Sequence, residues 1–197
     1  MRIDPDAWPF VGVLAAVAVA LAFWSPVAAL APAALLAFVV QFFRDPERRP
    51  PEERDALLAP ADGRVIVAGP GRISVFMNVF DVHVCRSPVS GRVASVERTR
   101  GSFLSAFKDA ASEHNERTAI VVEGPAGAVR FTLVAGLVAR RIVCRVSPGA
   151  VLTAGDRVGL IRFGSRVDLD LPPGAVPSVR VGDRVVAGET VVARIHP

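Results

Sequence analysis

The sequence predicts a mainly β protein with an N-terminal α-helical hairpin in a membrane. The stretch from Pro9 to Phe43 contains no charged residue. From Leu57 onward the chain consists of short Val- and Ile-rich runs separated by Gly, Pro and Asp, a pattern typical of strands and turns. The chain has 197 residues, of which 51% are hydrophobic, and this size fits one compact domain with an appendage.

The apolar N-terminal stretch is too long for one straight span, since a transmembrane helix needs about 20 residues. Ser25-Pro26 divides it into two arms, because proline interrupts a helix. We therefore expect residues 1–43 to form a helical hairpin that anchors the chain, either spanning the bilayer or only dipping into it. A buried soluble hairpin is the alternative. A cleaved signal peptide fits less well, because the leader MRIDPDAW is not clearly positive.

A cluster of arginines follows the hairpin between Arg44 and Arg54. Basic residues beside a membrane segment favour the cytoplasmic side and attract anionic headgroups. A hairpin returns the chain to its starting side. The sequence therefore predicts that residues 44–197 form a β-rich domain held at the cytoplasmic face of the cell membrane.

Charge and cysteine content exclude several classes of protein. The net charge of +4 indicates an anionic partner, but no nucleic-acid-binding motif is present. Cys85 and Cys144 are far apart and form no CxxC pair. They suit buried thiols in a reducing compartment better than a disulfide framework or a metal site.

A weak internal repeat relates residues 154–164, AGDRVGLIRFG, to residues 181–195, VGDRVVAGETVVARI. Each copy has Gly-Asp-Arg-Val after an expected turn and continues as a strand. This pattern resembles the hairpins of lipoyl and biotinyl domains and predicts a barrel-sandwich-like β domain. Neither copy contains a lysine, so a cofactor-carrier function is not supported.

Three groups of residues are candidates for chemistry in this body. Alternation along an expected strand places Asp81, His83 and Cys85 on one face. The Asp81 carboxylate would then fix the tautomer of the imidazole and raise its basicity; a structural core histidine is the alternative. His114 lies in a polar segment, and His196 lies near the C-terminus.

The second and third groups are Asp62 and an arginine pair. Asp62 precedes Gly63 in APADGRV, where a plain hairpin turn is the alternative interpretation. Arg140 and Arg141 lie together in an apolar segment. An arginine there needs a carboxylate or phosphate partner unless it faces solvent, and the pair is therefore a candidate for binding an anionic substrate.

Gly164 and Ser165 interrupt the apolar pattern of residues 157–171. The pair is either a bulge or a reactive position, because a serine beside a base can act as a nucleophile. No G-x-S-x-G elbow surrounds it. A serine hydrolase that uses Ser165, His83 and either Asp62 or Asp81 is one hypothesis.

Six ordered segments together resemble the phosphatidylserine decarboxylases, in particular their short, membrane-associated form. The resemblance covers about residues 42 to 172. The segments are FFRDPERRPP, APADGRV, VFMNVFDVHVCRSPVSGRV, KDAASEHNERT, VAGLVARRIVCRV and AGDRVGLIRFGSRVDLDLP.

The resemblance implies a proenzyme that cleaves itself between Gly164 and Ser165. Ser165 would become a covalent pyruvoyl group at the start of a small chain, residues 165–197, which stays with a large chain, residues 1–164. The pyruvoyl group would form a Schiff base with the serine headgroup of a phospholipid, release CO2 and give phosphatidylethanolamine. Asp62 and His83 match functional positions of the family. No pyridoxal phosphate and no metal are implied.

The sequence departs from the longer bacterial members of that family, which have Leu-Gly-Ser-Thr and a second histidine. Here the motif is Phe-Gly-Ser-Arg, and Arg86 stands at the place of the second histidine. The base for self-cleavage is therefore either His83 or a water held by Asp62, and His83 is our choice for the group that protonates Cα.

Two other hypotheses and the oligomeric state stay open at this stage. A membrane-anchored barrel-sandwich binding module would leave Gly164-Ser165 intact. An ether-linked lipid with the same headgroup would undergo the same reaction. The sequence does not distinguish a monomer from a homo-oligomer.

Overall fold

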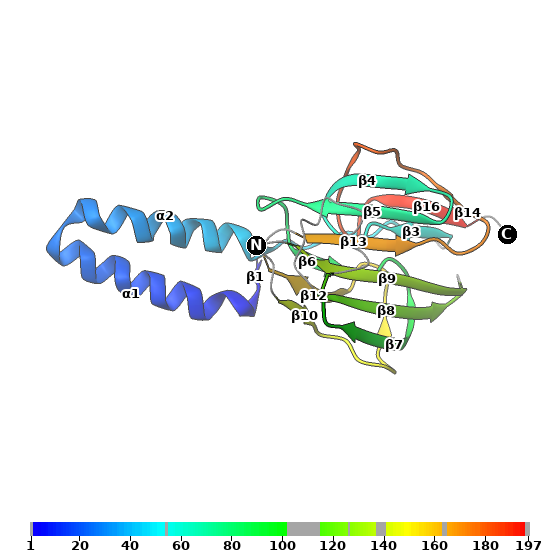
Figure 1. Cartoon of the computed structure of the whole chain (residues 1–197), viewed down its shortest axis with the longest axis horizontal. Coiled ribbons are helices and arrows are strands. Elements are labelled where there is room, and N and C mark those ends of the chain that lie inside the picture. The colour runs from blue at the N-terminus through cyan, green and yellow to red at the C-terminus, as the bar shows by residue number, and fades with distance from the viewer. Residues whose placement is uncertain are drawn as a thin grey trace. The chain divides into compact units, whose positions relative to one another are not determined.

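The computed structural model describes residues 2–53, 55–101, 115–125, 127–136, 141–162 and 165–195 (Figure 1). Gly164, Arg140, Lys108, His114 and His196 lie outside these ranges. The chain divides into two compact units, Met1–Glu47 and Arg48–Pro197.

The first unit is a helical hairpin. A short 3-10 helix, Pro5–Ala7, leads into α1 (Trp8–Trp24), which is followed by α2 (Pro26–Phe42). Ser25 separates the helices in an extended conformation, and its Oγ accepts the Ala28 N–H at 3.4 Å, so it caps the second helix. The strands β1 (Arg2–Ile3) and β2 (Arg44–Asp45) pair antiparallel at the base of the hairpin. The predicted division at Ser25-Pro26 is confirmed.

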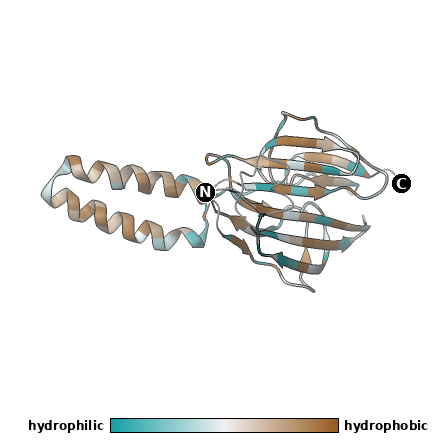
Figure 2. Ribbon diagram, in the orientation of Figure 1, coloured by the Kyte–Doolittle hydropathy of each residue, from teal (hydrophilic) through white to brown (hydrophobic). Residues whose placement is uncertain are grey.

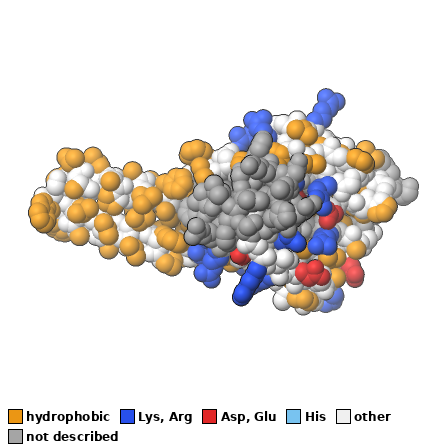
Figure 3. All heavy atoms as spheres, viewed as in Figure 1, with side chains coloured by type: hydrophobic (Ala, Val, Ile, Leu, Met, Phe, Trp, Pro, Cys, Tyr) orange, Lys and Arg blue, Asp and Glu red, His pale blue; other side chains and the backbone are white. Residues whose placement is uncertain are grey.

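The hairpin presents an apolar surface. Figure 3 shows hydrophobic side chains over the visible face of the two helices, and Phe23 and Trp24 are both 91% exposed. The segment Pro5–Trp24 is long and apolar enough to cross a membrane, whereas Pro26–Phe42 is apolar but shorter. An exposed apolar surface of this extent is typical of a region that contacts lipid or another protein.

The second unit is built from short strands. They are β3 (Ala56–Leu58), β4 (Gly63–Gly69), β5 (Arg72–Met77), β6 (Val84–Arg86), β7 (Gly91–Thr99), β8 (Arg117–Gly124), β9 (Gly127–Ala135), β10 (Ile142–Cys144), β11 (Val151–Leu152), β12 (Arg157–Ile161), β13 (Ser165–Asp170), β14 (Ala175–Pro177), β15 (Arg184–Val185) and β16 (Val191–Ile195).

These strands form one large curled antiparallel sheet and two small ones. The large sheet has the order β11-β7-β8-β9-β13-β5-β4-β15, and the small sheets have the orders β10-β12-β6 and β14-β16-β3. Figure 1 shows β13 lying between β9 and β5. Together with the hairpin, this arrangement confirms the predicted mainly β, barrel-sandwich-like fold.

The hydrophobic core lies on one face of the large sheet. Val167 of β13 is directly opposite Val75 of β5 and Leu133 of β9, and all three side chains are fully buried. Figure 2 shows hydrophilic and hydrophobic residues alternating along β13. Because side chains alternate between the faces of a strand, Ser165 and Leu169 share the core face with Val167.

The other face of β13 carries a buried polar cluster. The Arg166 guanidinium contacts the Asp168 carboxylate and also donates a hydrogen bond of 3.0 Å to the Ser74 hydroxyl. The exposed fractions are 2% for Arg166 and 3% for Asp168. Since a charge is costly to bury unless it is paired, the Asp168 carboxylate compensates the buried guanidinium of Arg166.

Replacing Asp168 with alanine is expected to destabilise the fold by about 3–5 kcal/mol, since Arg166 would lose its buried carboxylate. Asp170→Ala is the matched control: Asp170 pairs with Arg72, the side chains are 35% and 48% exposed, and such pairs contribute at most about 1 kcal/mol. Urea unfolding of both full-length variants in detergent would measure the difference. Equal midpoints would contradict the prediction.

The repeat seen in the sequence corresponds to two turns with the same hydrogen bonds. In the first, the Asp156 carboxylate accepts the Thr153 N–H at 2.7 Å, and in the second the Asp183 carboxylate accepts the Arg180 N–H at 2.8 Å. The glycine before each aspartate, Gly155 or Gly182, has a positive φ, which glycine adopts without strain.

Candidate active site

Ser165 is the first residue of β13. It lies opposite Met77 of β5 and Ala135 of β9, so it belongs to a regular ladder rather than to a bulge. Its side chain is fully buried, and among the described residues its Oγ has no hydrogen-bond partner. A buried hydroxyl without a partner costs free energy, which marks Ser165 as a candidate reactive group.

His83 contacts β12, the strand that precedes Ser165 in the sequence. The Ile161 N–H, at the end of β12, donates a 3.3 Å hydrogen bond to the His83 carbonyl. Residues 162–164 then connect β12 to Ser165. The turn that leads to His83 begins after Met77, which is the residue opposite Ser165. His83 therefore lies at the same end of the sheet as Ser165, because it contacts the end of β12 and follows the end of β5.

The His83 imidazole is oriented by a backbone group. Its Nδ1 lies 3.0 Å from the Asp81 carbonyl oxygen, and the ring is fully buried. Because a carbonyl only accepts, Nδ1 carries the proton in the neutral ring and Nε2 carries the lone pair. This is the tautomer in which Nε2 can act as a base.

The expectation that the Asp81 carboxylate orients His83 is wrong. The two carboxylate oxygens of Asp81 accept from the Asn78 N–H at 2.9 Å and from the Arg184 guanidinium. The expected alternation fails because residues 78–81 form a turn and β6 begins only at Val84. The backbone of Asp81, not its side chain, contacts the imidazole.

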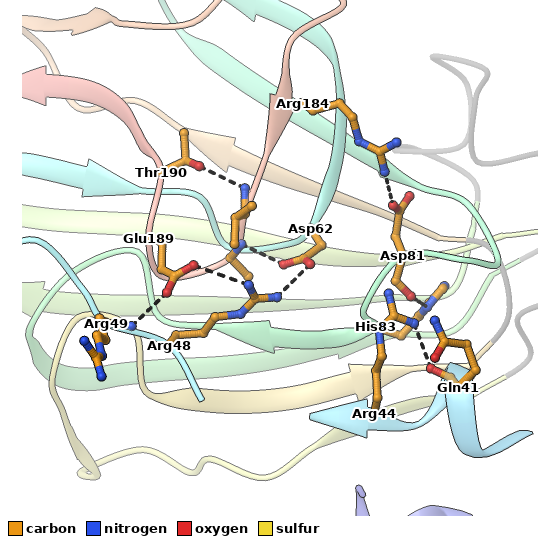
Figure 4. A network of polar contacts seen from close by, with 12 residues as sticks. Gln41, Arg44, Arg48, Arg49, Asp62, Asp81, His83, Arg184, Glu189 and Thr190 are labelled. Atoms are coloured by element: carbon orange, nitrogen blue, oxygen red, sulfur yellow. Dashed lines mark hydrogen bonds and ion pairs between the residues drawn. The ribbon is translucent and has the colours of Figure 1, made fainter. Parts of the chain in front are cut away.

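Asp62 lies in a network that links distant parts of the chain. Figure 4 shows the Arg48 guanidinium between Asp62 and Glu189, at 2.8 Å and 3.3 Å respectively. The second Asp62 oxygen accepts the Ala187 N–H at 2.8 Å. Burial raises the pKa of the Asp62 carboxyl above 3.8, although the Ala187 N–H and Arg48 oppose the shift.

These contacts bear on the serine hydrolase hypothesis. Among the described residues, the partners of Asp62 are Arg48 and Ala187, and those of Asp81 are Asn78 and Arg184. Neither carboxylate is bonded to His83. A Ser-His-Asp relay requires that bond, so the geometry does not favour a hydrolase.

Arg141 lies at the same end of the unit as Ser165. It is exposed, and its carbonyl accepts the Arg162 N–H at 3.2 Å, immediately before the connection to β13. The following residue, Ile142, pairs with Ile161. An exposed guanidinium there is available to an anionic ligand. Arg140, the other member of the predicted pair, lies outside the described residues.

Cys85 is not a second nucleophile. Burial is the main cause that raises the pKa of its thiol above the ordinary value, and the Asp62 carboxylate adds to the shift. The thiol therefore stays protonated and weakly reactive. Its Sγ lies 3.7 Å from the His83 carbonyl oxygen, so it packs beside the candidate site as a small apolar group.

Arg48 and the Arg166–Asp168 pair are not among the candidates that the sequence pattern indicates. Arg48 is one of the basic residues that follow the hairpin, and nothing in the sequence of that cluster distinguishes it. Arg166 and Asp168 did carry a signal, because opposite charges two residues apart share one face of a strand and are flanked here by Val167 and Leu169.

The candidate site is thus a buried serine hydroxyl at one end of the large sheet, in a chain that also has an apolar helix long enough to cross a membrane. The family model for phosphatidylserine decarboxylase matches residues 35–72 and 68–193. The chain is 47% identical to the phosphatidylserine decarboxylase proenzyme of Paraburkholderia phymatum, an alignment that covers 96% of this chain and 95% of that protein.

Two further relatives have the same description. The proenzyme of Paraburkholderia xenovorans is 46% identical over 96% of this chain and 95% of its own length, and that of Burkholderia mallei is 46% identical over 96% and 94%. The chain therefore belongs to the phosphatidylserine decarboxylase family, and it is a carboxy-lyase.

Proposed function

We propose that this chain is a phosphatidylserine decarboxylase that first cleaves itself between Gly164 and Ser165. It would convert the serine headgroup of a phospholipid into ethanolamine, giving phosphatidylethanolamine and CO2. The observation that carries the proposal is the buried Ser165 hydroxyl, which has no hydrogen-bond partner among the described residues, in a chain whose relatives are described as proenzymes.

Self-cleavage requires only groups of the chain and one water. The Ser165 Oγ attacks the Gly164 carbonyl carbon, and the acyl group moves from nitrogen to oxygen to give an ester. Removal of the Ser165 Cα proton then breaks the Cβ–Oγ bond, and Gly164 leaves as a carboxylate. The enamine left at residue 165 takes a proton at Cβ to become an imine, water adds at Cα, ammonia departs, and a pyruvoyl group remains at the start of the small chain.

His83 is the proposed base for these proton transfers. The hydrogen bond between its Nδ1 and the Asp81 carbonyl leaves Nε2 as the proton acceptor. The same nitrogen, once protonated, would deliver a proton to Cα of the product. Asp62 would orient the site through the Arg48 and Ala187 contacts; a water held by Asp62 is the alternative base for self-cleavage.

The residues around Ser165 fit a covalent pyruvoyl group. The group occupies the volume of the serine side chain, and Met77 and Ala135, directly opposite, are apolar. Its carbonyl supplies an electron sink for the carbon that bears the substrate carboxylate. Arg141 is proposed to bind the anionic substrate, together with Arg140. No step requires a metal, pyridoxal phosphate or the single lysine, Lys108.

The hairpin is proposed to hold the enzyme at its lipid substrate. The helix Pro5–Trp24 suits a membrane span by length and composition, and the arginines after the hairpin favour the cytoplasmic side. We therefore place residues 44–197 at the cytoplasmic face of the cell membrane. The proposal leaves a homo-oligomer open and includes no nucleic acid.

Activity on vesicles tests the proposal. Purified full-length protein with vesicles that contain phosphatidylserine is expected to release CO2 and phosphatidylethanolamine in equal amounts. An ether-linked lipid with the same headgroup is the second substrate, because the chemistry is confined to the headgroup. Mass spectrometry of the lipids measures the decarboxylation of both substrates. Protein that contains the cut small chain but forms no phosphatidylethanolamine would overturn the assignment.

A further inference from the structure

The turn between β5 and β6, residues Asn78–Asp81, presents two apolar side chains to solvent. Phe80 is 68% exposed and Val79 is 38% exposed. Among the described residues of the second unit, Phe80 is the only exposed aromatic side chain. Single exposed valines are ordinary, but an exposed phenylalanine gives up much of the free energy that burial would provide.

The turn is held in place by its own hydrogen bonds. The Asn78 N–H donates to the Asp81 carboxylate at 2.9 Å, and the Phe80 N–H donates to the Asn78 side-chain oxygen at 2.8 Å. The Asp81 N–H donates to the Asn78 carbonyl at 3.0 Å. The other Asp81 oxygen binds Arg184. These contacts fix the backbone that carries Phe80, so its exposure is a property of an ordered turn.

The turn lies at the end of the sheet where the candidate site is found. It begins immediately after Met77, which pairs with Ser165, and His83 follows Phe80 by three residues. A surface that binds Phe80 would therefore be brought close to the site.

Exposed arginines accompany the apolar turn. Arg184 is 66% exposed beside Asp81 and pairs in register with Arg64, which is also exposed. Arg141 is exposed at the same end. Asp62 and Asp81 at this end are largely buried and ion-paired; Asp183, an exposed carboxylate, caps the Arg180 N–H.

We propose that the turn Asn78–Asp81 is a lipid-binding element that inserts Phe80 and Val79 into the membrane beside the site. An apolar tip with arginines around it matches the boundary between acyl chains and anionic headgroups. The inference rests on the proposed function, because a decarboxylase acting on phospholipid must receive its substrate from a bilayer. It assigns to the β-rich unit a membrane contact of its own, separate from the hairpin.

Tryptophan fluorescence tests insertion without measuring activity. The chain has two tryptophans, Trp8 and Trp24, both in the hairpin. Phe80→Trp in a Trp8→Phe/Trp24→Phe background, reconstituted as the full chain in anionic vesicles, is expected to show blue-shifted emission that lipids brominated near the headgroup quench. Val151→Trp in the same background is the control, because Val151 is 71% exposed and pairs with Arg92 at the opposite end.

The fluorescence outcomes discriminate between the partners. If bromolipid does not quench the indole fluorescence of F80W, and its emission resembles that of V151W, the turn does not enter the lipid. If its emission is blue-shifted without bromolipid quenching, and a soluble quencher does not reach it either, a protein or a second copy of the chain covers the turn. Either result overturns the proposal.

Kinetics provide an independent comparison. Phe80→Ser is expected to raise KM for phosphatidylserine in vesicles roughly 10-fold, because the anchoring side chain is lost, and to leave turnover of monomeric short-chain phosphatidylserine unchanged. Phe80→Leu should restore most of the vesicle activity. Equal losses on both substrates would place Phe80 in the site and contradict the proposal. A wild type inactive on both would instead refute the proposed function, and the fluorescence test would still decide insertion.

Discussion

A Ser165→Ala variant is expected to remain a single uncut chain, whereas the wild type separates into residues 1–164 and 165–197 under denaturing conditions. Alanine has no oxygen to attack the Gly164 carbonyl, so the loss of cleavage should be complete rather than partial. Because the Ser165 Oγ makes no hydrogen bond among the described residues, its removal should not destabilise the fold. Intact mass measurement shows both the cut and the ketone of the small chain.

Ser74→Ala is the matched control for this experiment. Ser74 is as fully buried as Ser165 and lies on the neighbouring strand β5, but its hydroxyl binds Arg166 on the opposite face. That variant should still be cut, although somewhat less stable. If the wild type stays whole, the self-cleavage proposal fails and the binding-module hypothesis gains support. If S165A is cut, a residue other than Ser165 provides the nucleophile.

Replacing His83 is expected to cause the second large effect. In His83→Asn the side-chain amide can still donate to the Asp81 carbonyl, so the turn is preserved while the base at Nε2 is lost. General acid–base groups contribute about 10²- to 10⁴-fold. We expect a loss of that size in the rate of self-cleavage, in turnover per cut chain, or in both. Intact mass gives the cut fraction, and turnover is then expressed per small chain.

Asp81→Asn is the control that tests whether the carboxylate or the backbone carbonyl of Asp81 orients His83. The structure places the backbone carbonyl of Asp81, not its carboxylate, on the imidazole. D81N keeps that carbonyl and should lose far less activity than H83N. A cut H83N enzyme with wild-type turnover would remove His83 from the decarboxylation step, and D81N as impaired as H83N would show that the carboxylate matters.

Much of the fold could be predicted because glycine, proline and aspartate mark the ends of its strands. One of the Val- and Ile-rich runs bounded by glycines, Gly63–Gly69, is β4, and Ser25-Pro26 separates the two helices as expected. The apolar pattern of residues 157–171 indicates an interruption only at Gly164 and Ser165, whereas β12 ends already at Ile161 and β13 begins with Ser165 itself. Local residue preferences therefore place the elements, but they do not fix the last residue of a strand whose end depends on its partners.

The candidate site was less predictable, because its contacts join residues that are distant in the sequence. Ser165 and His83 are candidates from their local sequence, and the resemblance implies their roles; the structure brings both to one end of the sheet. Arg48 was not found, because its partner Asp62 comes close only after the sheets pack. The role of Asp81 was assigned wrongly because alternation was assumed through a turn. Hydrogen bonds of a turn backbone cannot be read from a periodic pattern.

The position of β13 between β9 and β5 affects how the mature enzyme would fold. Before cleavage, the central strand is tethered to the rest of the chain, and folding is a first-order process. After the proposed cleavage, residues 165–195 supply the central strand together with β15 on β4 and β16 beside β3. Unfolding would release two molecules, so refolding would become second order and the apparent stability would depend on protein concentration. We therefore expect the sheet to be completed before the bond is cut, while β13 is still tethered to the rest of the chain.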